Sequence, residues 1–361
     1  MIDEKALAAY FSGRDLKVLI EQLKRRELTD PISEDLSEGL KRVLKERDVE
    51  CFTLPHTWRF ATRRDAARSR IAFLSEYGPY ETIIDASCGI GLMLRELATL
   101  KPTRLIGFEI DPTIAHLARA NLKLHGVQAE VHTIDSTSDD ALRMIADASL
   151  VFCDPERAES AQARTLDEST PRYTILSEHA KRLAYETSPR TPIAELPGTV
   201  ELYSERRRHA RTTIYTGFGI EERRVVSDRN ETIQGLPKPI KQTPPGSGRF
   251  IELLDTCIAR AELAHLFGGW HESHGKHLRL TDRIEPADFI DPYQVIATGE
   301  LATIKGVAQQ LTDFNRIALR YPVPAGSYWR EANAIRKSST GSRTIHVFRI
   351  NDGYVLAEPM P

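Results

Sequence analysis

The chain has 361 residues and is 41% hydrophobic, so it can bury the cores of two or three domains. Its 49 Lys and Arg residues and 51 Asp and Glu residues give a formal net charge of −2, so the chain as a whole is not a polycation. Any contact with nucleic acid would therefore need a local basic patch.

The cysteines are scattered without a C-x-x-C pair, which argues against both a zinc site and a disulfide framework. They are Cys51, Cys88, Cys153 and Cys257. No apolar run approaches the ~18 residues needed to span a bilayer, and the polar first residues lack the apolar stretch of a signal peptide. We therefore expect a cytoplasmic protein that does not enter a membrane.

Residues 1–75 are expected to form an N-terminal helical region. Two amphipathic stretches, separated by Asp30-Pro31, carry apolar residues at helical spacing: Leu16, Leu19, Ile20 and Leu23 in the first, and Leu36, Leu40, Val43 and Leu44 in the second. The polar side of the second stretch is basic, with Lys41, Arg42, Lys45 and Arg47. Such a side is either a solvated helix face or a nucleic-acid contact.

Residues 76–235 alternate between predicted strands and helices. Strands are expected at 82–86, 104–108, 129–134 and 149–153, and three more at 199–204, 210–216 and 222–227. A helix is expected at 92–100, and Asp111-Pro112 has the N-cap and first-turn residues of another helix, which ends near Gly126. This alternation predicts an α/β, Rossmann-like domain, in which a doubly wound parallel sheet carries helices on both faces.

A Pro- and Gly-rich connection at 237–248 precedes a second domain, which we expect at 245–361. Its predicted elements are a helix at 250–266, a strand at 293–298, a helix at 300–312, a strand at 315–320, a helix at 327–336 and a strand at 343–349. Asn351-Asp352-Gly353 then makes a hairpin turn into a strand at 354–358. This order predicts a small α+β, ferredoxin-like domain.

The strongest functional motif is Asp85-Ala-Ser-Cys-Gly-Ile-Gly91, between a predicted strand and a predicted helix. Gly89 and Gly91 let the backbone turn sharply and approach a ligand closely. The dinucleotide fingerprint G-x-G-x-x-G has a third glycine, which is missing here. Asp85 would also repel a phosphate, whereas it suits a positively charged ligand such as a sulfonium or an α-ammonium group.

Acidic residues also follow the next three predicted strands: Glu109, Asp135 and Asp154. Glu109 lies 20 positions after Gly89, a spacing at which an acid can accept hydrogen bonds from both ribose hydroxyls. Asp135 is placed to meet an adenine amino group. A single strand-end acid is often only a helix N-cap. Four acids in register, at the edge where such sheets bind ligands, predict a nucleoside site.

These motifs resemble those of the class I S-adenosylmethionine-dependent methyltransferases. Asp85 to Gly91 is similar to their motif I, Glu109 to the ribose-binding acid, Asp135 to the acid on the adenine side, and Asp154-Pro155 to the catalytic motif IV. The resemblance implies S-adenosyl-L-methionine as the cofactor. The residues that would bind it are Thr62, Asp85, Ser87, Cys88, Gly89, Gly91, Glu109, Ile110, Asp135, Ser136 and Asp154.

Over roughly residues 50–361, the chain also resembles a bacterial family of methyltransferases with a THUMP-like, ferredoxin-like C-terminal domain. One shared feature is an arginine-rich helix before motif I, here within Phe60–Arg70. The others are a Leu-Pro-Gly segment before a hairpin, here Leu196–Tyr215, and a THUMP-like end, here Ala318–Glu358. The family implies methylation of a base in RNA (tRNA or rRNA), largely through the THUMP-like domain, which is an analogy between folds.

Motif IV departs from the pattern of amine-directed methyltransferases, which read Asp/Asn-Pro-Pro-Tyr. Here Glu156 and Arg157 take the third and fourth places, so the aromatic ring that would stack on a flipped base is missing. Asp154 is the best candidate for holding the nucleophile or taking its proton, and Pro155 for shaping the pocket. Arg157 is either a phosphate contact or a structural partner of a nearby acid.

Basic residues recur along the chain, and on one common face they would form a footprint for RNA phosphates. They are Arg63, Arg64, Arg68, Arg70, Arg206, Arg207, Arg208, Arg211, Arg223 and Arg224. We take Arg63, Arg157 and Arg206 as candidate substrate contacts. The run from Arg206 to Arg208 fits an exposed hairpin turn equally well.

Other interpretations stay open from the sequence alone. Cys88 or Cys153 could supply the thiolate of a covalent mechanism, although Cys153 is more typical of a small core residue and Cys88 of a cofactor contact. The spacing of His271, His274 and His277 allows a metal, but the segment is loop-like and we expect none. The chain could also be a non-catalytic RNA-binding protein with a retained cofactor pocket, or a methyltransferase of small molecules.

Overall fold

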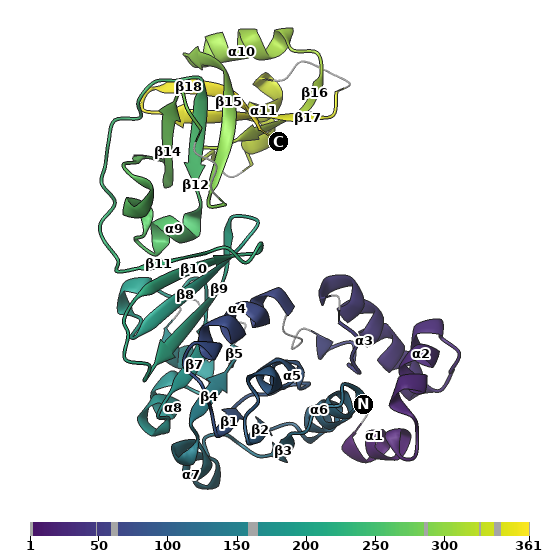
Figure 1. Cartoon of the computed structure of the whole chain (residues 1–361). Coiled ribbons are helices and arrows are strands. Elements are labelled where there is room, and N and C mark those ends of the chain that lie inside the picture. The colour runs from purple at the N-terminus through teal and green to yellow at the C-terminus, as the bar shows by residue number, and fades with distance from the viewer. Residues whose placement is uncertain are drawn as a thin grey trace. The chain divides into compact units, whose positions relative to one another are not determined.

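The computed structural model describes residues 3–47, 49–58, 64–157, 165–284, 288–324, 326–335 and 341–360. The chain divides into two compact units (Figure 1). Unit 1 comprises residues 1–203 and 210–222, and unit 2 comprises residues 204–209 and 223–361. No described helix combines the length and the apolar character that crossing a membrane requires.

Unit 1 is built on a sheet in which seven strands lie in the order β3-β2-β1-β4-β7-β9-β8. Their bounds are β1 (Thr82–Asp85), β2 (Arg104–Glu109), β3 (Glu130–Thr133), β4 (Leu150–Cys153), β7 (Leu183–Thr187), β8 (Thr199–Glu205) and β9 (Arg208–Thr216). The pairings from β3 to β7 are parallel, and β9 runs antiparallel to β7. The strand order reverses between β1 and β4, which makes this point the switch point of the sheet.

Helices cover both faces of this sheet, as the alternation of strands and helices predicts. Ile83 of β1 packs with α4 (Arg64–Ser75), α5 (Leu92–Leu97) and α6 (Pro112–Leu124) on one face. The next residue, Ile84, packs with α7 (Asp139–Asp147) and α8 (Tyr173–His179) on the other. The Rossmann-like prediction is therefore confirmed, and the two-residue period of a strand explains why both Ile83 and Ile84 are buried.

Local capping explains where α6 starts. The Asp111 carboxylate accepts hydrogen bonds from the backbone N–H groups of Thr113 and Ile114 at 2.7 and 3.1 Å, and Pro112 takes the first helical position. The Asp-Pro pair predicted this cap, and the role of Asp111 is therefore to cap α6.

The N-terminal helices are also present as predicted: α1 (Glu4–Phe11), α2 (Leu16–Arg25) and α3 (Pro31–Arg47). Their apolar residues share one core with residues of α6, with Ile90 of the motif I loop and with Leu92 at the start of α5. On the exposed side of α3, Arg42 forms an ion pair with Glu38 at 3.0 Å, which is typical of a solvated helix face. The helices therefore pack as an integral part of unit 1.

Asn121 ties the N-terminal segment to the rest of unit 1. Its side chain is buried, accepts a hydrogen bond from the Phe52 backbone N–H at 2.6 Å, and donates to the carbonyl oxygens of Phe52 and Ile90 at 3.0 and 2.9 Å. One amide group therefore satisfies three buried backbone groups.

We expect Asn121→Ala to lower the free energy of unfolding by about 1–3 kcal/mol, because these backbone groups would lose their partners in a dry environment. Urea unfolding of the full chain would measure the loss. Asn333→Ala, at an exposed position of a helix in unit 2, is the matched control and should change stability little. Equal stability of the two variants would contradict the prediction.

Unit 2 contains a seven-stranded, mostly antiparallel sheet in the order β13-β14-β12-β15-β18-β17-β16. Its strands are β12 (Phe250–Leu254), β13 (His271–Ser273), β14 (Lys276–Thr281), β15 (Ile290–Gly299), β16 (Phe314–Leu319), β17 (Arg343–Ile350) and β18 (Gly353–Pro359). The helices α10 (Leu301–Gln310) and α11 (Tyr328–Ile335) cover one face with a shared apolar core. The strands β10 (Arg223–Ser227) and β11 (Thr232–Gly235) pair antiparallel with each other.

The second half of unit 2 follows the predicted order of strand, helix, strand, helix, strand and strand, including the turn at Asn351, whose φ is +52°. The predicted helix at 250–266 is wrong. Residues 250–254 form β12, which pairs with β14 on one side and β15 on the other. Asp255 then caps the short helix α9 (Thr256–Arg260) by accepting from the Cys257 N–H at 2.7 Å. Pairing on both edges thus overrides the helical spacing of the apolar residues.

Candidate functional site

The acids at the strand ends come together at one edge of the unit 1 sheet. Asp85 ends β1 and Glu109 ends β2, and Asp154 directly follows β4. Asp85 pairs in register with Gly107 of β2 and Phe152 of β4, so these strands end within two residues of one another at the same edge. Asp135 follows β3, and the Ile134 N–H before it donates to the Glu109 carbonyl at 3.0 Å. The structure therefore places all four acids at the switch-point edge, as expected.

The motif I loop is held in a sharp turn above this edge. Gly89 and Gly91 have φ values of +52° and +84°, which favour glycine. A Cβ atom added to Gly91 would lie 3.3 Å from backbone atoms of Ala118 in α6, so the loop packs closely against that helix. The Gly89 N–H donates to Glu109 Oε2 at 3.0 Å. This hydrogen bond ties the motif I loop directly to Glu109, the acid that ends β2.

Glu109 is turned toward the loop, and its second oxygen, Oε1, accepts from the Asp111 N–H at 2.9 Å. Partial burial raises the pKa of Glu109, although these backbone donors oppose the shift. The next residue, Ile110, is 67% exposed, which is unusual for a large apolar side chain. An acid beside an exposed apolar surface suits a ligand that combines hydroxyl groups with a flat apolar ring.

Asp85 is 1% exposed and lies among other carboxylates. Burial, together with the charges of Asp154 and Glu109, raises the pKa of Asp85 to about 8, although the Ser87 N–H opposes this shift by donating a hydrogen bond at 3.2 Å. A buried acid with acidic neighbours is neutral at pH 7 unless a cation enters. A positively charged group placed beside Asp85 would favour the ionised form of this carboxyl.

Ser87 connects the motif I loop to the loop that follows β4. Its Oγ accepts a hydrogen bond from the Asp154 N–H at 3.0 Å and lies 3.4 Å from Cys153 Sγ. The Asp154 side chain is 30% exposed, and Pro155 is buried beside it. Glu156 and Arg157 form the short strand β5 (Glu156–Arg157), paired with β6 (Ser169–Thr170).

Two cysteines flank this site, and both are buried. Burial raises the pKa of Cys88 and of Cys153 well above the usual value for a thiol, and the neighbouring carboxylates add to the shift. A covalent mechanism needs a thiolate, which this environment disfavours. Both cysteines therefore fit a packing role.

Asp135 is exposed, and its Oδ1 accepts from the Thr137 N–H and hydroxyl at 2.8 and 2.7 Å. Ser136 beside it is buried. Arg206 belongs to unit 2, where it is exposed in the turn between β8 and β9 with a φ of +49°. Thr62, Arg63 and the side chain of Arg157 lie outside the described residues.

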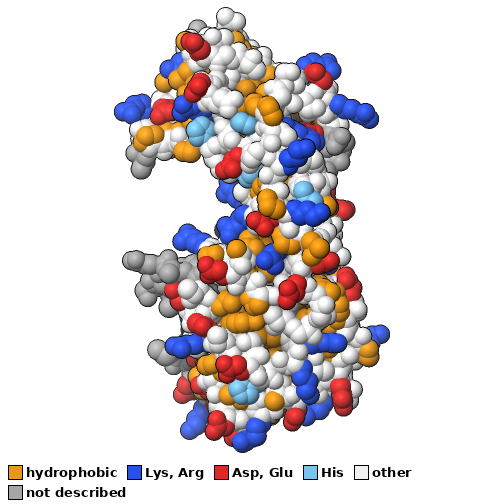
Figure 2. Space-filling model, turned by 90° about the vertical axis from the view of Figure 1, so that its left-hand side faces the viewer, with side chains coloured by type: hydrophobic (Ala, Val, Ile, Leu, Met, Phe, Trp, Pro, Cys, Tyr) orange, Lys and Arg blue, Asp and Glu red, His pale blue; other side chains and the backbone are white. Residues whose placement is uncertain are grey.

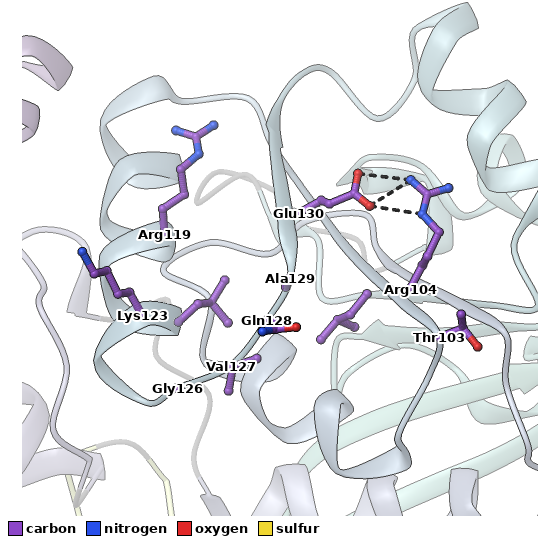
Figure 3. Close-up of a pocket in the computed structure, with 11 residues that line it drawn as sticks. Thr103, Arg104, Arg119, Lys123, Gly126, Val127, Gln128, Ala129 and Glu130 are labelled. Carbon is purple, nitrogen blue, oxygen red and sulfur yellow. Dashed lines mark hydrogen bonds and ion pairs between the residues drawn. The ribbon is translucent and has the colours of Figure 1, made fainter.

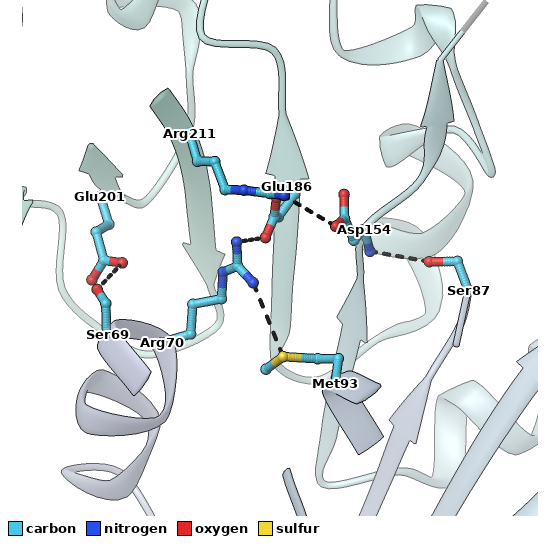
Figure 4. Close-up of polar contacts among 8 residues, drawn as sticks. All are labelled: Ser69, Arg70, Ser87, Met93, Asp154, Glu186, Glu201 and Arg211. Atoms are coloured by element: carbon cyan, nitrogen blue, oxygen red, sulfur yellow. Dashed lines mark hydrogen bonds and ion pairs between the residues drawn. The ribbon is translucent and has the colours of Figure 1, made fainter. Parts of the chain in front are cut away.

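The sequence analysis missed a buried ion network behind Asp154 (Figure 4). Arg211 of β9 donates to Asp154 Oδ2 at 3.3 Å and to Glu186 Oε2 of β7 at 2.6 Å. Arg70 of α4 forms an ion pair with the same Glu186. Arg70 and Arg211 therefore do not belong to an exposed phosphate footprint, because both are engaged by carboxylates inside unit 1. No motif marks such a network, since its members lie far apart in the sequence.

The remaining basic residues are mixed with acids. Arg68 lies 3.9 Å from Asp65 in an ion pair, and Figure 2 shows Lys and Arg side chains interspersed with Asp and Glu over the face drawn. In unit 2, the arginines around the β8–β9 turn meet four aspartates in a pocket of about 310 Å³, lined by Arg206, Arg207, Arg229, Asp228, Asp255, Asp288 and Asp291.

A larger pocket of about 650 Å³ lies at the opposite end of the strands (Figure 3). Arg104 and Glu130, at the starts of β2 and β3, form an ion pair at its wall, and Lys123 of the last turn of α6 lies across from them. Because Asp85 and Glu109 lie at the other ends of β1 and β2, this pocket is separate from the cluster of acids.

The histidines form no cluster of the kind expected for a metal. His271 and His277 lie on the paired strands β13 and β14, and His277 contacts Glu272 at 4.0 Å across the hairpin. His274 is in the turn, with a φ of +52°. Within the described part of the chain, no three His, Cys, Asp or Glu side chains converge as a metal site would require.

No protein-family model and no curated protein matches the sequence. Among solved structures, the chain is similar to a "putative methyltransferase" from Porphyromonas gingivalis W83, with a TM-score of 0.74, 11% identity and coverage of 100% of both chains. This likeness shows the fold: a class I S-adenosylmethionine-dependent methyltransferase fold with a second, curled antiparallel-sheet domain.

Two other solved structures are similar over smaller parts. The T. thermophilus 16S rRNA N2 G1207 methyltransferase in complex with AdoMet and guanosine has 15% identity and a TM-score of 0.30, over 38% of this chain and 36% of that one. A "putative" class I methyltransferase from Listeria monocytogenes has 12% identity and a TM-score of 0.35, over 58% and 72%.

Proposed function

We propose that the protein is an S-adenosylmethionine-dependent methyltransferase that acts on a base in RNA. The observation that carries the proposal is the burial of Asp85, which raises its pKa to about 8, within a group of acids at the switch-point edge. The fold is compatible with this cofactor, and the sequence resemblance assigns the same acids to it. The THUMP-like assignment of residues 245–361 and the RNA substrate rest on that resemblance alone.

The cofactor residues fit the groups that they would meet. Asp85 would face a cationic group of the donor, and Glu109, whose carboxylate keeps lone pairs beyond its two backbone contacts, would accept from the ribose hydroxyls. Ile110 would cover one face of the base. The full set is Thr62, Asp85, Ser87, Cys88, Gly89, Gly91, Glu109, Ile110, Asp135, Ser136 and Asp154.

The donor supplies an activated methyl group, so the protein has to orient the acceptor and manage its proton. Asp154 is half-exposed at the edge of the site, where its carboxylate can hold the nucleophile of the acceptor or take its proton. Pro155, buried behind it, would keep that loop in shape. Arg63, Arg157 and Arg206 are proposed to contact the RNA.

Transfer of tritium from methyl-labelled S-adenosylmethionine to RNA from a strain that lacks the gene tests the proposal. We expect incorporation with the wild-type chain and a loss of at least ~100-fold with Glu109→Ala, because the ribose would lose its charged acceptor. Glu81→Ala, an exposed acid at the other end of β1, is the control and should leave incorporation unchanged.

Two outcomes would contradict the proposed function. Cofactor binding by calorimetry without methyl transfer to any RNA would favour an RNA-binding protein with a retained pocket, or an enzyme for small molecules. Of these, only the RNA-binding protein should bind RNA with an affinity that falls as salt is added. Absence of cofactor binding would remove the site assignment itself.

A further inference from the structure

Four elements of unit 1 meet in the buried network behind Asp154. Arg70 comes from α4, Glu186 from β7 and Arg211 from β9, and Asp154 follows β4 (Figure 4). The strands β7 and β9 are paired antiparallel, with Glu186 opposite Thr213, so Arg211 reaches its two acids from a neighbouring strand. The network therefore joins the catalytic loop to parts of the sheet and to a helix far from it in sequence.

Glu186 is the fixed centre of this network. Its side chain is 0% exposed, and its two oxygens meet two different guanidinium groups, Oε1 with Arg70 and Oε2 with Arg211. Burial lowers the pKa of Arg70 to about 10, which leaves it charged at neutral pH. Two guanidinium groups on one dry carboxylate leave little freedom for any of the three side chains.

Arg211 links the buried Glu186 to the partly exposed Asp154. Its contact with Glu186 is 2.6 Å, whereas its contact with the more exposed Asp154 is 3.3 Å. The shorter contact, to the fully buried Glu186, therefore sets where the guanidinium lies, and the Asp154 carboxylate is oriented by it. Ser87 holds the backbone of Asp154 from the other side, as Figure 4 shows.

We propose that Arg211 is a positioning residue that fixes the direction of the Asp154 carboxylate toward the methyl acceptor. The proposal rests on the proposed function, since the Asp154 carboxylate is catalytic only if methyl transfer occurs there. Arg211 itself acts through Asp154 and Glu186. A purely structural role for Arg211 is the competing explanation, and the two differ in what a substitution changes.

Arg211→Ala in the full chain tests this positioning role, with Arg143→Ala as the matched control. Arg143 is 73% exposed and forms an ion pair with Asp140, one turn away on α7. For Arg211→Ala we expect affinity for S-adenosylmethionine within about threefold of the wild type, KM for RNA within about threefold, and kcat lower by about 100-fold, the loss typical of a misplaced catalytic group. Added methylguanidine should restore part of kcat. The control should match the wild type.

A folded Arg211→Ala with wild-type kcat would overturn the proposal, as would a loss confined to thermal stability. If that variant does not fold, Arg211→Lys replaces it, because a single ammonium group cannot bridge both carboxylates as the guanidinium does. We then expect kcat to fall about 10-fold, and an unchanged kcat would overturn the proposal.

A structural readout separates this proposal from the proposed function. In crystals of the Arg211 variant with S-adenosylhomocysteine, the Asp154 carboxylate should leave the direction that it has in wild-type crystals with the same ligand. If the wild type transfers no methyl group to RNA, the proposed function fails, and the crystals still decide whether Arg211 orients Asp154. An unmoved carboxylate would overturn the positioning role.

Discussion

Asp85→Asn should abolish measurable binding of S-adenosylmethionine and, at the same time, make the empty protein more stable at pH 8. The folded protein holds the pKa of Asp85 at about 8, whereas an aspartate in an unfolded chain has a pKa of about 3.9. Between these values the folded state binds a proton that the unfolded state has released. The free energy of unfolding of the wild type therefore falls as the pH rises toward 8.

Asp85→Asn keeps the shape of the side chain but has no carboxyl group to titrate, so it removes the contribution of residue 85 to the pH dependence of stability. Relative to the variant, the wild type should lose roughly 4 kcal/mol of stability between pH 5 and pH 8. Urea unfolding at a series of pH values measures the difference, and taking wild type minus variant cancels the other titrating groups. Asp147→Asn, at an exposed position at the end of α7, should show no such slope.

We also expect Asp85 to release its proton when S-adenosylmethionine binds. A cation beside Asp85 favours its ionised form, so binding at pH 7 should release about one proton, and affinity should rise with pH up to about 8. Calorimetry in two buffers of different ionisation enthalpy counts that proton. Binding without proton release, or an Asp85→Asn variant that binds as well as the wild type, would show that Asp85 does not face the donor.

The second large effect concerns stability: Glu186→Gln should lower the free energy of unfolding by about 3–5 kcal/mol. Glu186→Gln removes the carboxylate that lies between Arg70 and Arg211, and Arg70, whose side chain is 2% exposed, then loses its ion-pair partner in a dry interior. Urea unfolding at pH 7 measures the loss. Replacing Arg70 and Glu186 together by apolar residues should recover much of it, because the cost comes from the unpaired charge.

Glu130→Gln is the matched control for Glu186→Gln. Glu130 also forms an ion pair with an arginine, Arg104, but the two side chains are 49% and 53% exposed. Exposed pairs contribute less than about 1 kcal/mol, so this variant should stay close to the wild type. Similar losses in the two variants would mean that burial does not determine the strength of the network.

The parts of this molecule that follow local patterns were predictable from the sequence. The glycines of motif I, the acids at the strand ends and the Asp111 cap each depend on a few neighbouring residues, and the parallel sheet then brings the strand ends together. The helix expected at 250–266 failed because β12 takes its structure from partners on β14 and β15, which the local spacing does not reveal.

The ion network behind Asp154 could not be predicted for a related reason. Arg70 and Arg211 are charged residues in a chain rich in arginine, and nothing near them in sequence distinguishes a buried pair from a surface contact. Glu186 lies in β7, a strand that the pattern analysis did not identify. Only the pairing of β7 with β4 and β9 places this acid between the two arginines.

The apolar contacts of Ile90 and Leu92 bear on how this protein can be shortened. Ile90 belongs to the glycine loop and Leu92 is the first residue of α5, and their neighbours include side chains of α1, α2 and α3. A fragment trimmed to begin at residue 76 would expose that apolar surface to water and would lose the Phe52 partner of Asn121. The N-terminal helices therefore support the glycine loop, and a shortened chain that keeps this loop folded has to include them.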